Sequence, residues 1–190
     1  MHLNFGIIFL TISALWFFSE IMLNVLRRSK NADENRDKGS LRLLNIVIYT
    51  CVALAVTVNI MGIGRIATTN ATIPWIGVAV IICGLILRWT AILTLRRYFT
   101  TNVVIQRDHQ IIRTGLYRYI RHPSYSGALL SFWGLGLAFC NWISIIVLIV
   151  PITFAFLKRI QLEEQALLTA FGEQYSSYRK TTRALIPWIY

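Results

Sequence analysis

Acidic residues and cysteines are scarce in this 190-residue chain. The 8 Asp and Glu residues are outnumbered by 19 Lys and Arg residues. The cysteines Cys51, Cys83 and Cys140 stand singly in apolar runs, so neither a disulfide framework nor a zinc site is predicted. We expect them to be small core residues, and we expect no metal. The two Gly-x-Gly sequences, at 62–64 and 134–136, follow no predicted strand, which argues against a Rossmann domain.

Long apolar runs dominate what the chain does contain. Hydrophobic residues make up 56% of the sequence and charged residues 14%. A helix needs about 20 apolar residues to cross a hydrocarbon core of about 30 Å, and only helices and closed barrels satisfy their backbone groups there. The runs favour helices. The first run lacks a basic segment before it and a cleavage site after it, so it is expected to be a retained span.

The apolar runs predict an all-α, polytopic membrane protein with about five transmembrane helices. Two shorter runs, separated by Cys140 and Asn141, predict a tight helical hairpin with Pro123 in its first turn. We divide the chain into residues 1–95, with three transmembrane helices, and residues 96–190, with a polar loop, the hairpin and a last helix. The five predicted spans are Leu3–Leu26, Leu43–Gly62, Ile73–Leu95, Tyr125–Phe139 and Trp142–Leu157.

The positions of the basic residues predict the topology. Residues 27–42 hold six Lys and Arg residues, whereas the next link holds only Arg65 and the hairpin turn holds none. With five spans every basic segment falls on one side, which places the N-terminus outside and the C-terminus in the cytoplasm. The membrane would be the inner membrane of a bacterium or the endoplasmic reticulum of a eukaryote. Basic loops of this kind face anionic membrane lipids, and nucleic acid is not expected as a partner.

The segment 157–178 reads as a cytoplasmic amphipathic helix on the membrane surface. Its apolar residues fall on one helical face, and Gly172 is a candidate cap or break.

Two polar clusters flank the hairpin: HQIIRTGLYRYIRHPSY before it and KRIQLEEQ after it. Because a hairpin returns to the side it left, His122 and Tyr125 are expected near Arg159 and Glu163. The alternative is that the arginines are ordinary positive-inside anchors and that Glu163 and Glu164 form a solvated face.

The sequence around the hairpin carries a specific pattern, G-x-Y-x-x-x-R-H-P-x-Y-x-G, followed by the Glu163–Glu164 pair and F-G-x-x-Y-x-x-Y. The first pattern consists of Gly115, Tyr117, Arg121, His122, Pro123, Tyr125 and Gly127. With this pattern, the C-terminal half resembles the isoprenylcysteine carboxyl methyltransferase and phospholipid methyltransferase superfamily of integral membrane enzymes.

The resemblance implies that residues 96–190 form a catalytic region that binds S-adenosylmethionine without a Rossmann domain. It also implies that Arg159 orients the substrate. The implied cofactor contacts are His109, Ile111, Ile112, Tyr117, His122, Pro123, Ser124, Tyr125 and Glu163.

The residues themselves leave simpler interpretations open. Arg159 and Glu163 are one helical turn apart, so they can face one pocket or form a plain ion pair. The tyrosines offer π faces to a sulfonium or adenine, but tyrosines near an interface are often anchors. His109 could be a solvated loop residue. Arg88 and Glu20, each inside a span, could face a partner or a cavity, or could snorkel toward water.

The resemblance predicts carboxyl methylation of an isoprenylcysteine-like acceptor, which would be a lipid or a lipidated small molecule or peptide. A carboxylate nucleophile needs no general base. An amine N-methyltransferase is the alternative, and it would require a base such as Glu164 or His122. An NADPH-dependent enzyme resembling sterol reductases and a non-enzymatic membrane adaptor are further alternatives.

Overall fold

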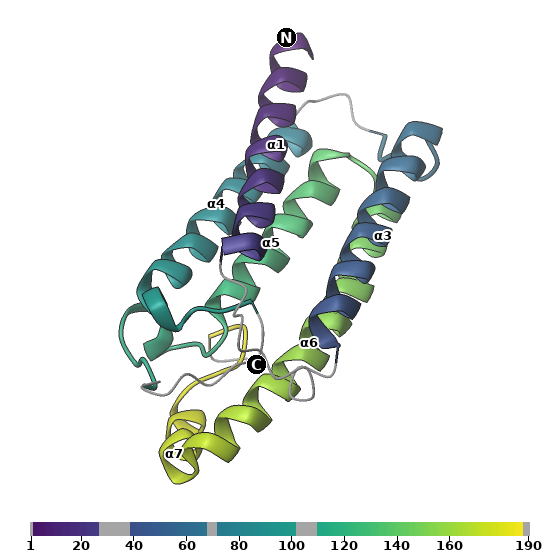
Figure 1. Cartoon of the computed structure of the whole chain (residues 1–190). Coiled ribbons are helices and arrows are strands. Elements are labelled where there is room, and N and C mark those ends of the chain that lie inside the picture. Colours follow the sequence, from purple (N-terminus) through teal and green to yellow (C-terminus); the bar gives the residue numbers. More distant parts are fainter. Residues whose placement is uncertain (1, 27–38, 68–71, 102–109, 188–190) are drawn as a thin grey trace.

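The computed structural model describes residues 2–26, 39–67, 72–101 and 110–187, and these are helical apart from turns and isolated β-bridges (Figure 1). The predicted all-α class is confirmed. The helices are α1 (His2–Leu26), α3 (Ser40–Met61), α4 (Thr72–Leu95), α5 (Pro123–Ala138), α6 (Trp142–Phe171) and α7 (Glu173–Thr181), with short 3-10 helices η1 (Arg96–Tyr98) and η2 (Gly115–Arg118).

Four of the described helices are long and apolar enough to cross a membrane: α1, α3, α4 with its η1 extension, and α6. Helix α5, the first arm of the hairpin, has 16 residues, fewer than the roughly 20 that a straight span needs. Pro123 occupies its first turn as expected. The count of five spans stays a prediction.

Helix α6 differs from the prediction because it runs unbroken for 30 residues. The sequence suggested a span ending near Leu157 and a separate amphipathic helix from there to Tyr178. No strong helix breaker lies between Leu157 and Phe171, so the helix continues from the apolar segment into the polar one. It ends at Gly172, whose φ of 50° and ψ of −124° suit glycine and disfavour other residues. Helix α7 begins directly after this break.

Helices α4 and α5 pack antiparallel with their backbones in contact. A Cβ atom placed on Gly77 would lie 2.3 Å from the backbone nitrogen of Ala138, and one on Gly127 would lie 2.6 Å from that of Arg88. Gly84 and Gly134 are equally crowded. Small residues of this kind let membrane helices approach closely. The close contact fixes the first turn of α5 beside the later half of α4.

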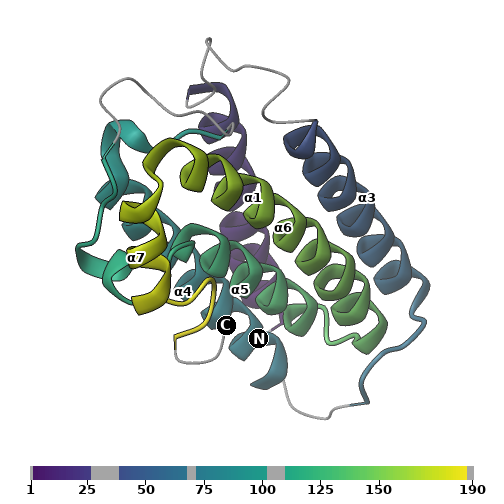
Figure 2. The same ribbon diagram turned by 90° about the horizontal axis from the view of Figure 1, so that it is seen from below.

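Helices α3 and α6 form the other side of the molecule, and Figures 1 and 2 show them running side by side. The Asn141 side chain accepts a hydrogen bond from the Ser144 backbone at 3.0 Å and donates one to the Ile63 carbonyl at 2.7 Å. It therefore caps α6 and joins it to the end of α3. Cys51 of α3 belongs to the buried core, whereas Cys83 of α4 is exposed, contrary to expectation.

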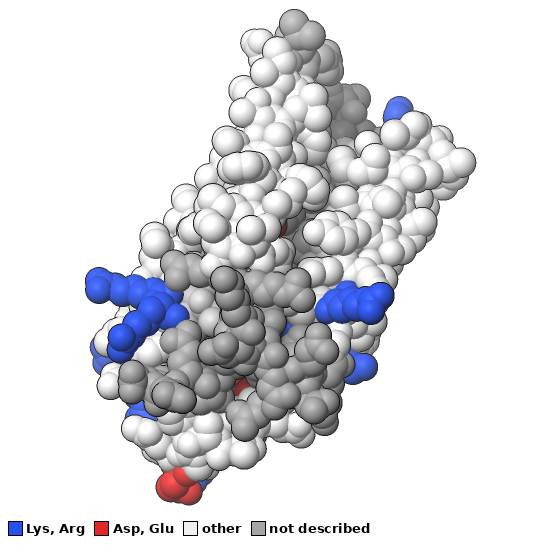
Figure 3. Space-filling model, viewed as in Figure 1, with Lys and Arg blue, Asp and Glu red and all other residues white. Residues whose placement is uncertain are grey.

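Charge is concentrated at one end of the bundle. In Figure 3, Lys and Arg gather around the lower part of the molecule, whereas the upper part is almost free of them on that face. Arg65, near the end of α3, forms a β-bridge with Asn141 at the hairpin turn, so those two links share the opposite end.

Candidate active site

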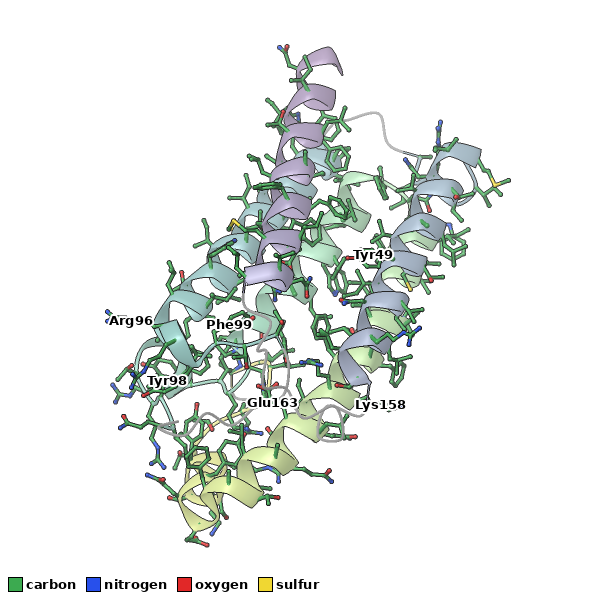
Figure 4. All side chains as sticks on the ribbon, viewed as in Figure 1. Tyr49, Arg96, Tyr98, Phe99, Lys158 and Glu163 are labelled. Atoms are coloured by element: carbon green, nitrogen blue, oxygen red, sulfur yellow. The ribbon has the colours of Figure 1, made fainter. Side chains whose placement is uncertain are left out.

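A cavity of about 680 Å³ lies between the helices and joins a polar end to an apolar groove. Its polar end is lined by the side chains that flank the hairpin, and its apolar part is lined by α1, α3 and one face of α5. Figure 4 shows Glu163 on the inner side of α6, toward the segment that carries Tyr98 and Phe99. The residues from α5 that line it are Ser124, Tyr125, Ala128, Phe132 and Leu135.

The start of α5 is held by the C-terminal segment. The backbone N–H of Arg121 donates to the Arg183 carbonyl at 2.8 Å, and that of His122 donates to the Ala184 carbonyl at 3.0 Å. The Arg183 N–H donates back to the Tyr119 carbonyl at 3.1 Å. This short parallel pairing fixes the turn before Pro123 and therefore the direction in which His122 faces.

Tyr125 connects the two polar clusters that the sequence predicted to meet. Its hydroxyl donates to Glu163 Oε2 at 2.8 Å and accepts from Arg159 Nε at 3.1 Å. The His122 ring stacks on the Tyr125 ring with centroids 5.5 Å apart, and its Nδ1 lies 3.7 Å from Glu163 Oε2. The hairpin thus brings together residues that are almost forty positions apart.

Arg159 is buried at the junction of three segments. Its Nη1 donates to Ser40 Oγ, in the first turn of α3, at 2.9 Å, and its Nη2 donates to the Thr101 carbonyl. Only 3% of the residue is exposed, although the preceding Lys158 is exposed. A planar guanidinium with donors in fixed directions suits this junction, whereas an ordinary membrane anchor would extend into the headgroups.

The two neighbouring glutamates face different surroundings. Glu163 lines the cavity and keeps 33% of its side chain exposed, whereas Glu164 is outside the lining and 8% exposed. Glu164 Oε1 accepts from Arg121 Nε at 2.7 Å, and its Oε2 lies 3.2 Å from Arg179 Nε. The alternative of a solvated acidic face is therefore wrong for Glu164, which ties α6 to α7 and to the turn before α5.

Buried tyrosines form another wall of the polar end. Tyr117, Tyr175 and Tyr178 line the cavity, and the Tyr178 hydroxyl donates to the Tyr117 carbonyl at 2.6 Å. Burial raises the pKa of Tyr178 to about 12, and burial together with the Glu163 charge raises the pKa of Tyr117. Both phenols therefore stay neutral near pH 7 and act as donors and apolar faces. Tyr117 is 5% exposed, which is inconsistent with an interface anchor.

The other predicted contacts divide into three groups. Ile111, Ile112 and Ser124 line the cavity. Pro123 is buried in the first turn of α5 and does not line it. His109 lies outside the described residues.

The structure also adds polar residues that sequence reasoning left unassigned. Glu20 of α1 and Arg88 of α4 line the cavity and form an ion pair, with Arg88 Nη2 2.7 Å from Glu20 Oε2. The sequence did hold a sign of this ion pair, because it places one acidic and one basic residue inside separate apolar runs. Nothing in the local sequence indicated the contacts of Ser40 and Thr101 with Arg159.

Comparison with known proteins identifies the family. The sequence profile described as the isoprenylcysteine carboxyl methyltransferase (ICMT) family matches residues 75–169, half of the chain. The chain belongs to this family. The ICMT match begins in α4 and ends in α6, so it includes both polar clusters and the hairpin, while α1 and α3 lie outside it.

Individual ICMT relatives agree with this assignment. Protein-S-isoprenylcysteine O-methyltransferase B of Arabidopsis thaliana is 40% identical over 115 residues, 60% of this chain and 58% of the relative. Protein-S-isoprenylcysteine O-methyltransferase of Tribolium castaneum is 36% identical over 118 residues, 60% of this chain and 41% of the relative. The chain therefore matches less than two thirds of the length of these relatives.

A solved structure has the same fold. The structure of the eukaryotic intramembrane Ras methyltransferase ICMT superposes with a TM-score of 0.63 and 29% identity, over 76% of this chain and 52% of that one. Together with the four long apolar helices, the likeness shows that this chain is an integral membrane protein.

The polar end of the cavity leads to a first test. We expect Glu163→Ala and His122→Ala each to weaken S-adenosylmethionine binding about tenfold or more, because each removes a polar partner worth roughly 1 to 3 kcal/mol from a partly enclosed pocket. Calorimetry on protein in detergent measures the affinity, and thermal unfolding checks that the variants fold. Glu173→Ala, on the exposed first turn of α7, is the matched control. Normal binding by both site variants would contradict the assignment.

Proposed function

We propose that this protein transfers a methyl group from S-adenosylmethionine to the carboxylate of an isoprenylcysteine-like lipid acceptor. The observation that carries the proposal is the single cavity in which the Arg159–Tyr125–Glu163 cluster opens onto an apolar groove. The ICMT match covers the hairpin and these three residues, and the relatives are named for O-methylation of isoprenylcysteine.

The polar end fits S-adenosylmethionine by its donor and acceptor set. The Glu163 carboxylate, partly exposed to the cavity, is an acceptor for hydroxyl or amino groups. The Tyr117 ring and the apolar Ile111 and Ile112 suit an adenine ring. The cofactor supplies an activated methyl group on a positively charged sulfur.

The protein's own part in the reaction is alignment and exclusion of water. Arg159 carries a positive charge at the cavity wall, where it can orient an acceptor carboxylate in line with the methyl group. Tyr125 holds the Arg159 side chain in place through its hydroxyl. Because a carboxylate is already nucleophilic, the site needs no side chain to remove a proton.

The apolar groove suits the lipid part of such an acceptor. Its walls include Phe9 and Phe17 from α1 and Val52 from α3, and it follows one face of α5 from Ser124 to Leu135. The eleven residue-to-residue steps from Ser124 to Leu135 correspond to about 16 Å of helix. A lipid chain in this groove would leave its polar head beside Arg159.

We infer that the charged end of the bundle faces the cytoplasm, which would place the cofactor site within reach of soluble S-adenosylmethionine. The clustering of Lys and Arg at that end supports this orientation (Figure 3). Accessibility tags inserted at Asn35 and at the C-terminus are expected on the cytoplasmic side, and one at Asn70 on the opposite side. Finding the Asn35 and Asn70 tags on one side would refute this topology.

The chemistry of the product tests the proposed function directly. Purified protein with tritiated S-adenosylmethionine and an S-prenylated cysteine should give a methyl ester, which releases volatile methanol in alkali. The rate should change little between about pH 6.5 and 8.5, because a carboxyl group with a pKa of about 4 is already ionised throughout. An amine acceptor would instead react faster as it deprotonates. An alkali-stable label with a steep rise in rate would replace carboxyl methylation by N-methylation.

Variants of Arg159 test its role in orienting the acceptor. Arg159→Lys should retain some activity because the charge survives, but it loses the planar pair of donors. Arg159→Ala should lower the rate about 100-fold or more, since misplacing a reacting group by about 1 Å has an effect of that size. Lys158→Ala, a change to the adjacent exposed cation, is the control and should leave the rate near that of the unmodified protein. Equal rates for the Arg159→Ala and Lys158→Ala proteins would rule out the proposed role.

A further inference from the structure

Arg88 connects three helices inside the apolar part of the molecule. Its side chain is 11% exposed, and its Nε and Nη2 lie 2.6 and 2.7 Å from the two carboxylate oxygens of Glu20. Its Nη1 donates in the opposite direction, to the carbonyl of Ser124 at 3.1 Å and to its hydroxyl at 3.2 Å. One guanidinium thus joins α1, α4 and the first turn of α5.

The backbone contact between α4 and α5 makes this reach possible. Gly127 has no side chain, and a Cβ atom there would lie 2.6 Å from the Arg88 nitrogen and 2.9 Å from its Cα. Helix α5 therefore rests directly on the backbone of Arg88, and the arginine side chain extends along it to Ser124. Ser124 immediately precedes Tyr125, which contacts both Glu163 and Arg159.

The ion pair also fixes the position of α1, which forms one wall of the apolar groove. Beyond this pair, α1 meets the bundle mainly through aromatic contacts, such as Trp16 with Phe132 at 5.1 Å and Phe9 with Phe139 at 5.8 Å between ring centroids. Such contacts can slide in a lipid environment, because lipid chains compete with them equally well. A paired charge in an apolar setting has no equivalent alternative partner, so it sets the position of α1 more strictly.

We propose that Arg88, through its Ser124 contacts, is a positioning residue for the cofactor-binding turn of α5, and that Glu20 fastens α1 to Arg88 as a wall of the apolar groove. The inference rests on the proposed methyl transfer, and it assigns separate tasks to the two partners. Loss of the Arg88 donors affects the turn that carries Tyr125 and hence cofactor affinity. Loss of Glu20 affects α1 and hence the acceptor.

Single substitutions separate these tasks. Arg88→Lys keeps the charge beside Glu20, but one ammonium group cannot also reach Ser124, so the Kd for S-adenosylmethionine should rise about 5- to 10-fold. Glu20→Gln leaves the Ser124 contacts, so the cofactor Kd should stay within about twofold while the KM for the prenylated acceptor rises about fivefold or more. Arg118→Gln, at an exposed arginine of η2, is the control.

A charge reversal distinguishes positioning from a purely structural role. The double variant Glu20→Arg, Arg88→Glu restores an ion pair between α1 and α4, so the melting temperature and the acceptor KM should recover. A glutamate cannot donate to the Ser124 carbonyl, so the cofactor Kd should remain high. Gly127→Ala, which pushes α5 off Arg88, should reproduce the cofactor effect with both charges intact, whereas Gly6→Ala, with open space around it, should not.

The outcomes also separate this inference from the proposed function. Unmodified protein that neither binds S-adenosylmethionine nor labels a prenylated cysteine would overturn the function and the inference together. Unmodified protein that does both, with Arg88→Lys and the double variant binding cofactor normally, would overturn the inference alone. So would a double variant whose cofactor Kd recovers together with its melting temperature.

Discussion

The backbone contact between α4 and α5 is the constraint on which the arrangement of the site depends. Glycines on both helices let the two axes approach until a single added methyl group would collide with the facing main chain. That approach places Arg88 beside Ser124 and holds the first turn of α5 at a fixed height. The residue after Ser124 is Tyr125, the hydroxyl of which joins α5 to α6. A slightly wider spacing would separate these contacts.

The polar end of the bundle uses similar residue types for two purposes. Neighbouring residues of a helix point about 100° apart, so Glu163 and Glu164 cannot share one environment. Glu163 faces the cavity, while Glu164 is surrounded by Arg121, Arg179 and His122. The second set closes the end of the bundle by joining α6, α7 and the turn before α5. The acidic residues of this region, scarce in the chain as a whole, are thus divided between the cavity wall and the framework.

Much of this arrangement could be predicted from the sequence because it follows from local patterns. Apolar run lengths placed the first three helices within a few residues, and the return of the hairpin predicted that Tyr125 and Glu163 would lie together. Local sequence patterns did not predict three other features. These are the continuity of α6, the direction of Glu164 and the pairing of Glu20 with Arg88. These depend on how each helix is rotated about its axis relative to partners far away in the sequence, which a local period of 3.6 residues does not specify.

Helix α6 continues through Pro151 as one helix of 30 residues, so its apolar part and Arg159 belong to the same element. Arg159 lies 17 residues after Trp142, or about 26 Å along the axis, close to the hydrocarbon thickness of about 30 Å. The hydrogen-bonded helix therefore sets the distance between Trp142 and Arg159, which a loop would not do. In a thicker bilayer the helix must stand more upright or draw its charged end into the lipid, and both changes alter the depth of Arg159 in the membrane. Membrane thickness therefore influences where the polar end of the cavity lies relative to the lipid headgroups.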